Sequence, residues 1–118
     1  HLAYESEEVM RIWLIGADEA GTEALRQFQK NPTIEVIITD TIDRPKAVVD
    51  GVIAKVDSVE RVTQINVNTL ARRLRPDLIM IDNGAAKRSL SRLSGALAYT
   101  EAFQNEIAAI SEFPCLII

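Results

Sequence analysis

The chain has 118 residues, of which 47% are hydrophobic and 25% are charged, and this balance and length are typical of one folded globular domain. The formal net charge of −4 and the lack of any run of about 18 apolar residues argue against nucleic acid and membranes as partners of this domain. A lone cysteine, Cys115, cannot form an internal disulfide, and we therefore expect a cytoplasmic protein.

Residues 1–9 are acidic and lack the basic start and apolar centre of a signal peptide. We expect them to be a linker or an upstream remnant, and we expect residues 10–118 to form the domain. The first apolar run, Ile12–Ile15, is continuous rather than alternating, which predicts a strand covered on both faces. Trp13 lies within this run and is expected in the core.

A degenerate glycine motif follows the first predicted strand. Gly16 and Gly21 have the spacing of the first and third glycines of G-x-G-x-x-G, but Asp18 stands where the second glycine should be. A pyrophosphate would have to approach the backbone where Asp18 adds a side chain and a negative charge. Both glycines also have a structural interpretation, as a tight turn and a close helix contact, and Asp18 then only caps the helix.

The next segment predicts a helix and a second strand. Gly21, Leu25 and Phe28 form one packing stripe, and the second apolar run is Ile34–Ile38. Asp40 follows it, 19 residues after Gly21, close to the spacing of an acid that binds a ribose hydroxyl in NAD sites. The residues around Asp40 are also ordinary turn residues, so a solvated loop acid is the alternative.

The middle of the chain gives the weakest pattern. Residues 44–66 fit either a strand or a short helix, and we favour a strand near Val59 to Ile65. Asn66 is the expected N-cap of a helix that stops at Pro76, with an apolar stripe formed by Val67, Leu70, Ala71 and Leu74.

The third apolar run, Leu78–Ile81, predicts a further strand, and a polar loop follows it. In this loop Asn83, Lys87 and Arg88 suit an anion, although a solvated basic face is the alternative interpretation. Apolar residues spaced by three and four from Leu90 to Ile110 predict a long helix, or two helices broken at Gly95.

The last run, Cys115–Ile118, predicts a final strand in which Cys115 is a buried core residue rather than a reactive thiol. Alternating strands and helices predict an α/β fold, a three-layer sandwich around a parallel sheet with strand order 3-2-1-4-5. His1 is the only histidine, so Ser-His-Asp and Cys-His arrangements are excluded within the chain. We therefore expect a domain without its own catalysis.

The glycine motif, Asp40 and the run from Pro76 to Asp82 together resemble NAD(P)-binding Rossmann-like domains. The types most similar are the nucleotide-binding domains of potassium-transport regulators and the CoA-binding-like domains of polysaccharide-biosynthesis enzymes. The resemblance implies a regulatory or accessory domain that binds NAD or a related nucleotide at Gly16, Gly21 and Asp40. A protein partner or a homodimer is a further expectation.

A second resemblance is to response-regulator receivers, in which Asp18 and Glu19 would be the acidic pair and Asp82 the phosphoacceptor. It implies a receiver-like or pseudo-receiver module for signalling or protein interaction. The stretch from Ile38 to Pro76 is about twice as long as a receiver needs between those elements. A strand between residues 44 and 66 would therefore count against this alternative.

Overall fold

The computed structural model describes residues 8–90 and 104–118 of the chain. Besides the labelled elements, residues 104–110 are helical. The elements in chain order are β1 (Met10–Ile15), α2 (Glu19–Phe28), β2 (Ile34–Asp40), α3 (Lys46–Val49), β3 (Ser58–Val59), α4 (Val67–Leu74), β4 (Leu78–Ile81), α5 (Asn83–Leu90) and β5 (Cys115–Ile117). None of the helices in the described residues is long and apolar enough to cross a membrane.

The five strands form one parallel sheet in the order β3-β2-β1-β4-β5, which confirms the predicted α/β fold and strand order. Ile15, the last residue of β1, pairs with Thr39 of β2 on one side and with Ile81 of β4 on the other. The carboxyl ends of these three strands therefore meet at one edge of the sheet. The chain order reverses between β1 and β4, and such switch points are where α/β sheets bind ligands.

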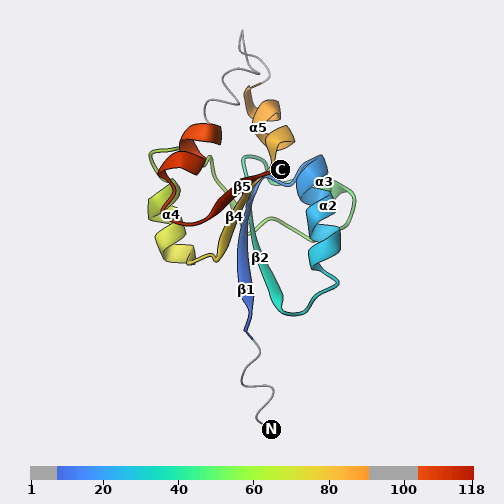
Figure 1. The fold of residues 1–118 in the computed structure, drawn as a ribbon. Coiled ribbons are helices and arrows are strands. Elements are labelled where there is room, and N and C mark those ends of the chain that lie inside the picture. Colours follow the sequence, from blue (N-terminus) through green and yellow to red (C-terminus); the bar gives the residue numbers. More distant parts are fainter. Residues whose placement is uncertain (1–7, 91–103) are drawn as a thin grey trace.

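Helices cover both faces of the sheet, as the continuous apolar strands require. Figure 1 shows α2 and α3 on one face, with α4 and the helix of residues 104–110 on the other. Successive residues of β1 point to opposite faces, so Ile12 and Leu14 pack with Leu25, while Trp13 packs with Val67 and Ile107. Each face thus has its own apolar cluster, and burial of these clusters provides the main driving force for folding.

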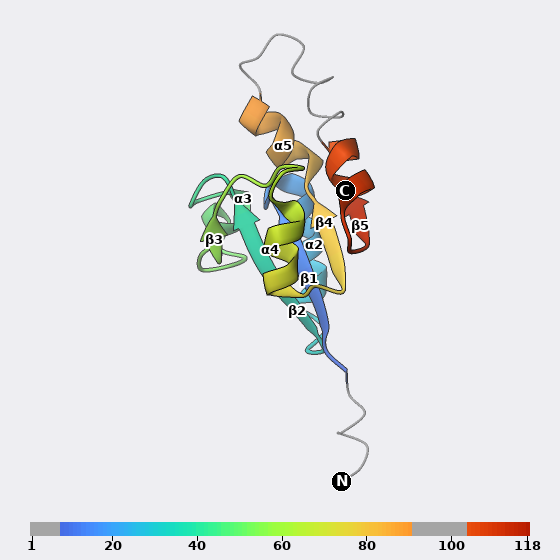
Figure 2. The same cartoon turned by 90° about the vertical axis from the view of Figure 1, so that its left-hand side faces the viewer.

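The two edges of the sheet are short. Figure 2 shows β3 and β5 on opposite sides of the three longer strands. Cys115 on β5 is half-buried, less than expected, because an edge strand has a neighbour on one side only. Partial burial raises the pKa of the Cys115 thiol, since the thiolate would lose solvation.

The middle of the chain corrects the sequence prediction. The strand in this segment, β3, is limited to Ser58–Val59, so the strand expected near Val59 to Ile65 is wrong beyond its first residue. Ile65 is 88% exposed, because the chain turns here instead of extending. The turn is held by Asn66, whose Oδ1 accepts from the Thr63 N–H at 2.8 Å. The short helix α3 also lies in this segment.

The helix predictions hold for α2 and α4, with one change at a terminus. Asn66 precedes α4, but its side chain makes no capping hydrogen bond to that helix and is used by the preceding turn. α4 ends at Leu74 and Arg75 takes a left-handed conformation with φ of 55° before Pro76. The predicted helix break at Gly95 lies outside the described residues.

Candidate functional site

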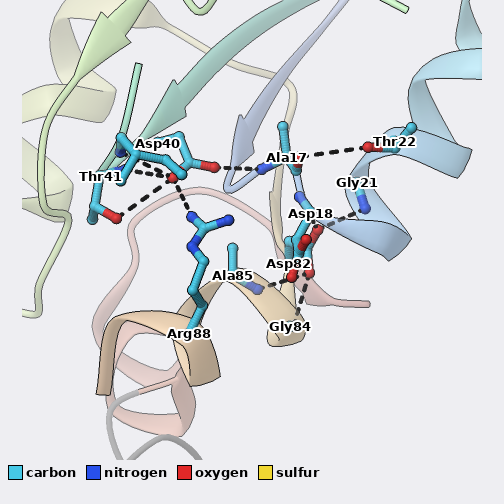
Figure 3. A network of polar contacts seen from close by, with 11 residues as sticks. Ala17, Asp18, Gly21, Thr22, Asp40, Thr41, Asp82, Gly84, Ala85 and Arg88 are labelled. Atoms are coloured by element: carbon cyan, nitrogen blue, oxygen red, sulfur yellow. Dashed lines mark hydrogen bonds and ion pairs between the residues drawn. The ribbon is translucent and has the colours of Figure 1, made fainter. Parts of the chain in front are cut away.

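The structure brings together the three segments that the sequence singled out, but the third, expected as a loop after Leu78–Ile81, is helical from Asn83 onward and forms α5. Gly16 follows β1, Asp40 ends β2 and Asp82 follows β4, so all three lie at the carboxyl edge of the sheet. Figure 3 shows Asp82 between the start of α2 and the start of α5, and Asp40 beside Arg88. Both carboxylates are buried, with Asp82 1% and Asp40 2% exposed. Their partners decide what each can do.

Asp82 accepts four backbone hydrogen bonds from two helices. Its Oδ2 accepts from the N–H of Asp18 at 2.8 Å and of Gly21 at 2.7 Å. Its Oδ1 accepts from the N–H of Gly84 at 2.8 Å and of Ala85 at 3.2 Å. One carboxylate therefore satisfies two of the free N–H groups at the start of each of α2 and α5, where a negative charge is favoured by both helix dipoles. We call Asp82 with these four donors the Asp82 junction.

The glycines of the motif make the Asp82 junction possible. Gly16 has φ of 93°, and a Cβ on it would lie 2.5 Å from the Ala85 Cβ. A Cβ on Gly21 would lie 2.6 Å from the Gly16 carbonyl oxygen and 2.8 Å from Asp82 Oδ2. Real Cβ atoms do not approach other atoms so closely. The turn and the close helix contact expected for these glycines are therefore present, and what approaches them is the protein itself.

Asp40 is held by the backbone and by an ion pair. Its Oδ2 accepts from the Ala17 N–H at 2.8 Å, and its Oδ1 accepts from the Thr41 N–H at 2.6 Å. The Arg88 guanidinium of α5 donates to the same Oδ1 and forms a salt bridge with it. This ion pair compensates the buried charge and ties the end of β2 to α5. Oδ2 has a lone pair beyond its bond to Ala17.

The remaining predicted residues divide between site and surface. Asp18 stands at the N-cap position of α2, but its side chain makes no capping hydrogen bond, and only its N–H contributes to the Asp82 junction. Of the two basic residues expected to suit an anion, Arg88 pairs with Asp40 and Lys87 is exposed. The N–H of Asn83 donates to the Ile118 carbonyl oxygen at 3.0 Å, which links α5 to the end of the chain.

A cavity of about 190 Å³ lies beside the two carboxylates. The cavity lies on the sheet face that α4 and residues 104–110 cover, because its lining includes Ile15, Ile81 and Ile107 of the apolar cluster on that face. Its walls are mainly apolar. The residues that line it are Ile15, Gly16, Asp40, Thr41, Glu60, Arg61, Val62, Thr63, Ile81, Asp82, Ala85, Ala86, Gln104 and Ile107.

One polar side chain in the cavity wall lacks a partner. Gln104 is 4% exposed, and its Nε2 has no hydrogen-bond partner among residues 8–90 and 104–118. Buried amides are nearly always hydrogen-bonded, so this N–H is a donor beside the cavity whose partner, a water or another molecule, is not part of the described chain. Sequence analysis missed Gln104, because a glutamine in an amphipathic segment carries no distinctive pattern.

The receiver alternative meets mixed findings. Asp18 and Asp82 do lie side by side at one end of the sheet, as that alternative predicts. However, all four donors of the Asp82 junction bind the expected phosphoacceptor, and β3 lies in the segment where a strand counts against a receiver. The strand order also differs from the flavodoxin-like order 2-1-3-4-5. Within the described parts of the chain, no three His, Cys, Asp or Glu residues cluster as metal ligands.

The candidate site thus consists of a saturated carboxylate at the switch point and an apolar cavity with one unpaired amide next to it. The position of the cavity is general to α/β sheets, so it does not by itself name a family. Comparisons of the chain with protein-family models, with curated proteins and with solved structures each gave no match.

Proposed function

We propose that this chain is a regulatory or accessory domain without its own catalysis, and that it binds a nucleoside-containing ligand related to NAD in the cavity. The observation that carries the proposal is the unpaired amide of Gln104 in the wall of a cavity at the switch point. Small-molecule sites are concave and mainly apolar with a few polar groups that orient the ligand, and this cavity has that character.

The polar groups of the cavity suit a nucleoside. Asp40 ends β2, where ribose-binding acids stand in dinucleotide sites, and its Oδ2 can accept one more hydrogen bond. Ile15, Ile81 and Ile107 offer apolar surface to a flat ring. Gln104 Nε2 would donate to a ring nitrogen or a carbonyl oxygen of the base.

Two features support a domain without its own catalysis: the single histidine of the chain and the hydrogen bonds that Asp82 accepts. The chain has one histidine, His1, which rules out histidine-dependent triads within it. The oxygens of Asp82 each accept two backbone hydrogen bonds, so this carboxylate has no unused lone pair to offer a substrate. Binding without reaction is typical of regulatory domains.

Thermal unfolding with a ligand panel tests the proposal. The panel contains adenosine, AMP, ATP, NAD, NADP, CoA and S-adenosylmethionine, each titrated to high concentration. A ligand at 100 times its Kd stabilises the folded state by about 2.7 kcal/mol, which is measurable as a higher Tm. We expect at least one nucleoside-containing compound to raise the Tm, and no effect from the whole panel would overturn the proposal.

A pair of variants locates the binding. Gln104→Leu removes the unpaired amide from the cavity wall and keeps the side-chain volume. The matched control is Gln64→Leu, since Gln64 Oε1 is also buried without a partner in the described residues but Gln64 does not line the cavity. We expect Gln104→Leu to weaken binding about tenfold, which equals one lost hydrogen bond. Equal affinities of the two variants would contradict this location.

A further inference from the structure

We infer that Asp82 occupies the place of a ligand phosphate, so that the cavity selects an uncharged nucleoside over its phosphorylated forms. This inference rests on the proposed function and specifies its ligand. Three independent features of the site support it: the hydrogen-bond donors at the helix starts, the space around them and the charges that line the cavity.

Two of the donors that a phosphate would use are already bound. In a parallel α/β sheet a phosphate binds the N–H groups at the start of the helix after β1. Here the N–H groups of Asp18 and Gly21 both donate to Asp82 Oδ2. A ligand phosphate would have to displace a carboxylate that is 1% exposed and also bonded to α5. The protein supplies its own anion at this position.

The space is filled as well. A Cβ on Gly84 would lie 3.2 Å from Asp18 Oδ2 and 3.3 Å from Asp82 Oδ1, which shows that α5 begins in contact with both side chains. Gly16 and Ala85 approach so closely that no side chain fits between them. The start of α5 therefore packs where a pyrophosphate would lie against α2, and Figure 3 shows the two helix starts on either side of Asp82.

The size and charge of the cavity fit a small neutral molecule. Its 190 Å³ is below the lower limit of about 300 Å³ for pockets that take drug-sized ligands. Asp40, Glu60 and Asp82 are the acidic residues that line it, and Arg61 is the basic one, while Arg88 pairs with Asp40 from α5. With both guanidiniums counted, one negative charge is left over, which disfavours a phosphate, whereas an uncharged base and ribose meet the mainly apolar wall beside Gln104.

Calorimetry on the full chain tests the inference with four nucleosides, their 5′-monophosphates and NAD as the probes. We expect one nucleoside to bind at least tenfold more tightly than its own monophosphate and than NAD. If a monophosphate or NAD binds as tightly as the nucleoside, the inference is wrong and the proposed function stands. If neither nucleosides nor nucleotides bind, the proposed function fails and the inference fails with it.

A variant then tests the role of Asp82. Asp82→Asn removes the negative charge of this carboxylate. We therefore expect the affinity for the nucleoside, divided by the affinity for its monophosphate, to fall at least tenfold toward one. The control is Glu112→Gln, which removes one negative charge from a surface pair with Arg72 outside the cavity wall and should leave the ratio unchanged. An unchanged ratio in folded Asp82→Asn would overturn the inference. If circular dichroism shows that this variant does not fold, the wild-type ratio decides.

Discussion

The Asp82 junction and the cavity beside it are built by the same strand ends, yet they treat buried polar groups in opposite ways. In the Asp82 junction each carboxylate oxygen accepts two backbone hydrogen bonds. In the cavity wall, Gln104 has an Nε2 that is also buried and has no partner in the described chain. A satisfied buried group stabilises the fold, whereas an unsatisfied one costs stability unless something else binds it. The difference separates the structural role of Asp82 from the binding role that we propose for Gln104, 22 residues further along the chain.

The largest effect is expected from breaking the Asp82 junction. Asp82→Asn replaces an acceptor oxygen by an NH₂ group, so two backbone N–H groups lose their acceptor and both helix starts lose a negative charge. We expect the free energy of unfolding to fall by about 4 kcal/mol, measured by urea denaturation.

Gln104, in the wall of the cavity, provides the control for that measurement. Gln104→Leu removes a buried amide that has no partner among the described residues, so the unliganded protein should keep or gain stability. Comparable losses of unfolding free energy in Asp82→Asn and Gln104→Leu would show that the satisfied carboxylate and the unpaired amide do not differ in their effect on stability.

A smaller effect is expected from the glycine that lets α5 approach β1. Gly16→Ala places a Cβ 2.5 Å from the Ala85 Cβ at a φ of 93°, and we expect a loss of about 3 kcal/mol from overlap and backbone strain. Gly51→Ala is the matched control, because Gly51 has φ of 74° but no atom within 4 Å of the added Cβ. It should cost only about 1 kcal/mol. Similar losses for both variants, by thermal unfolding, would mean that the close approach is unimportant.

The smallest effect is expected far from either region, at the exposed pair of Arg72 and Glu112. The hydrogen bond from Arg72 holds the pKa of Glu112 below its ordinary value of 4.5. A carboxylate with a lowered pKa stabilises the fold above the pKa it has when unfolded, and this contribution disappears as the pH falls through the folded-state pKa. Wild type and Glu112→Gln should therefore differ slightly at pH 7 and not at pH 2.5 in urea denaturation. A difference that grows on acidification would contradict this sign.

The sheet was predictable because its strands are continuous apolar runs. Leu78–Ile81 was located to the residue, and the crossovers between such runs allow few strand orders. β3 was misplaced because its two residues carry no apolar run, and the spacing of Val62 and Ile65 belongs to a turn before α4. The residue pattern of a segment does not predict a strand that forms because of its neighbour in the sheet rather than because of its own composition.

The candidate site was predictable in position but not in its contacts. Spacing alone places Gly16, Gly21 and Asp40 at one sheet edge, as the structure does. It could not show that Asp82, 61 residues after Gly21, accepts the N–H bond a phosphate would take. Asp82 stands directly before Asn83 and Gly84 at a helix start, and this capping pattern was the available signal. The NAD prediction itself stays a prediction.

Trp13 gives the molecule a built-in optical probe. It is the only tryptophan of the chain, it is fully buried in the central strand, and its indole N–H donates to Thr39 Oγ1 at 3.0 Å. Ile15, two residues further along β1 and on the same face, lines the cavity. The intrinsic fluorescence of the protein therefore originates from one site in the core, with a short emission wavelength in the folded state. Spectral changes in this single emitter report the integrity of the sheet without any added label.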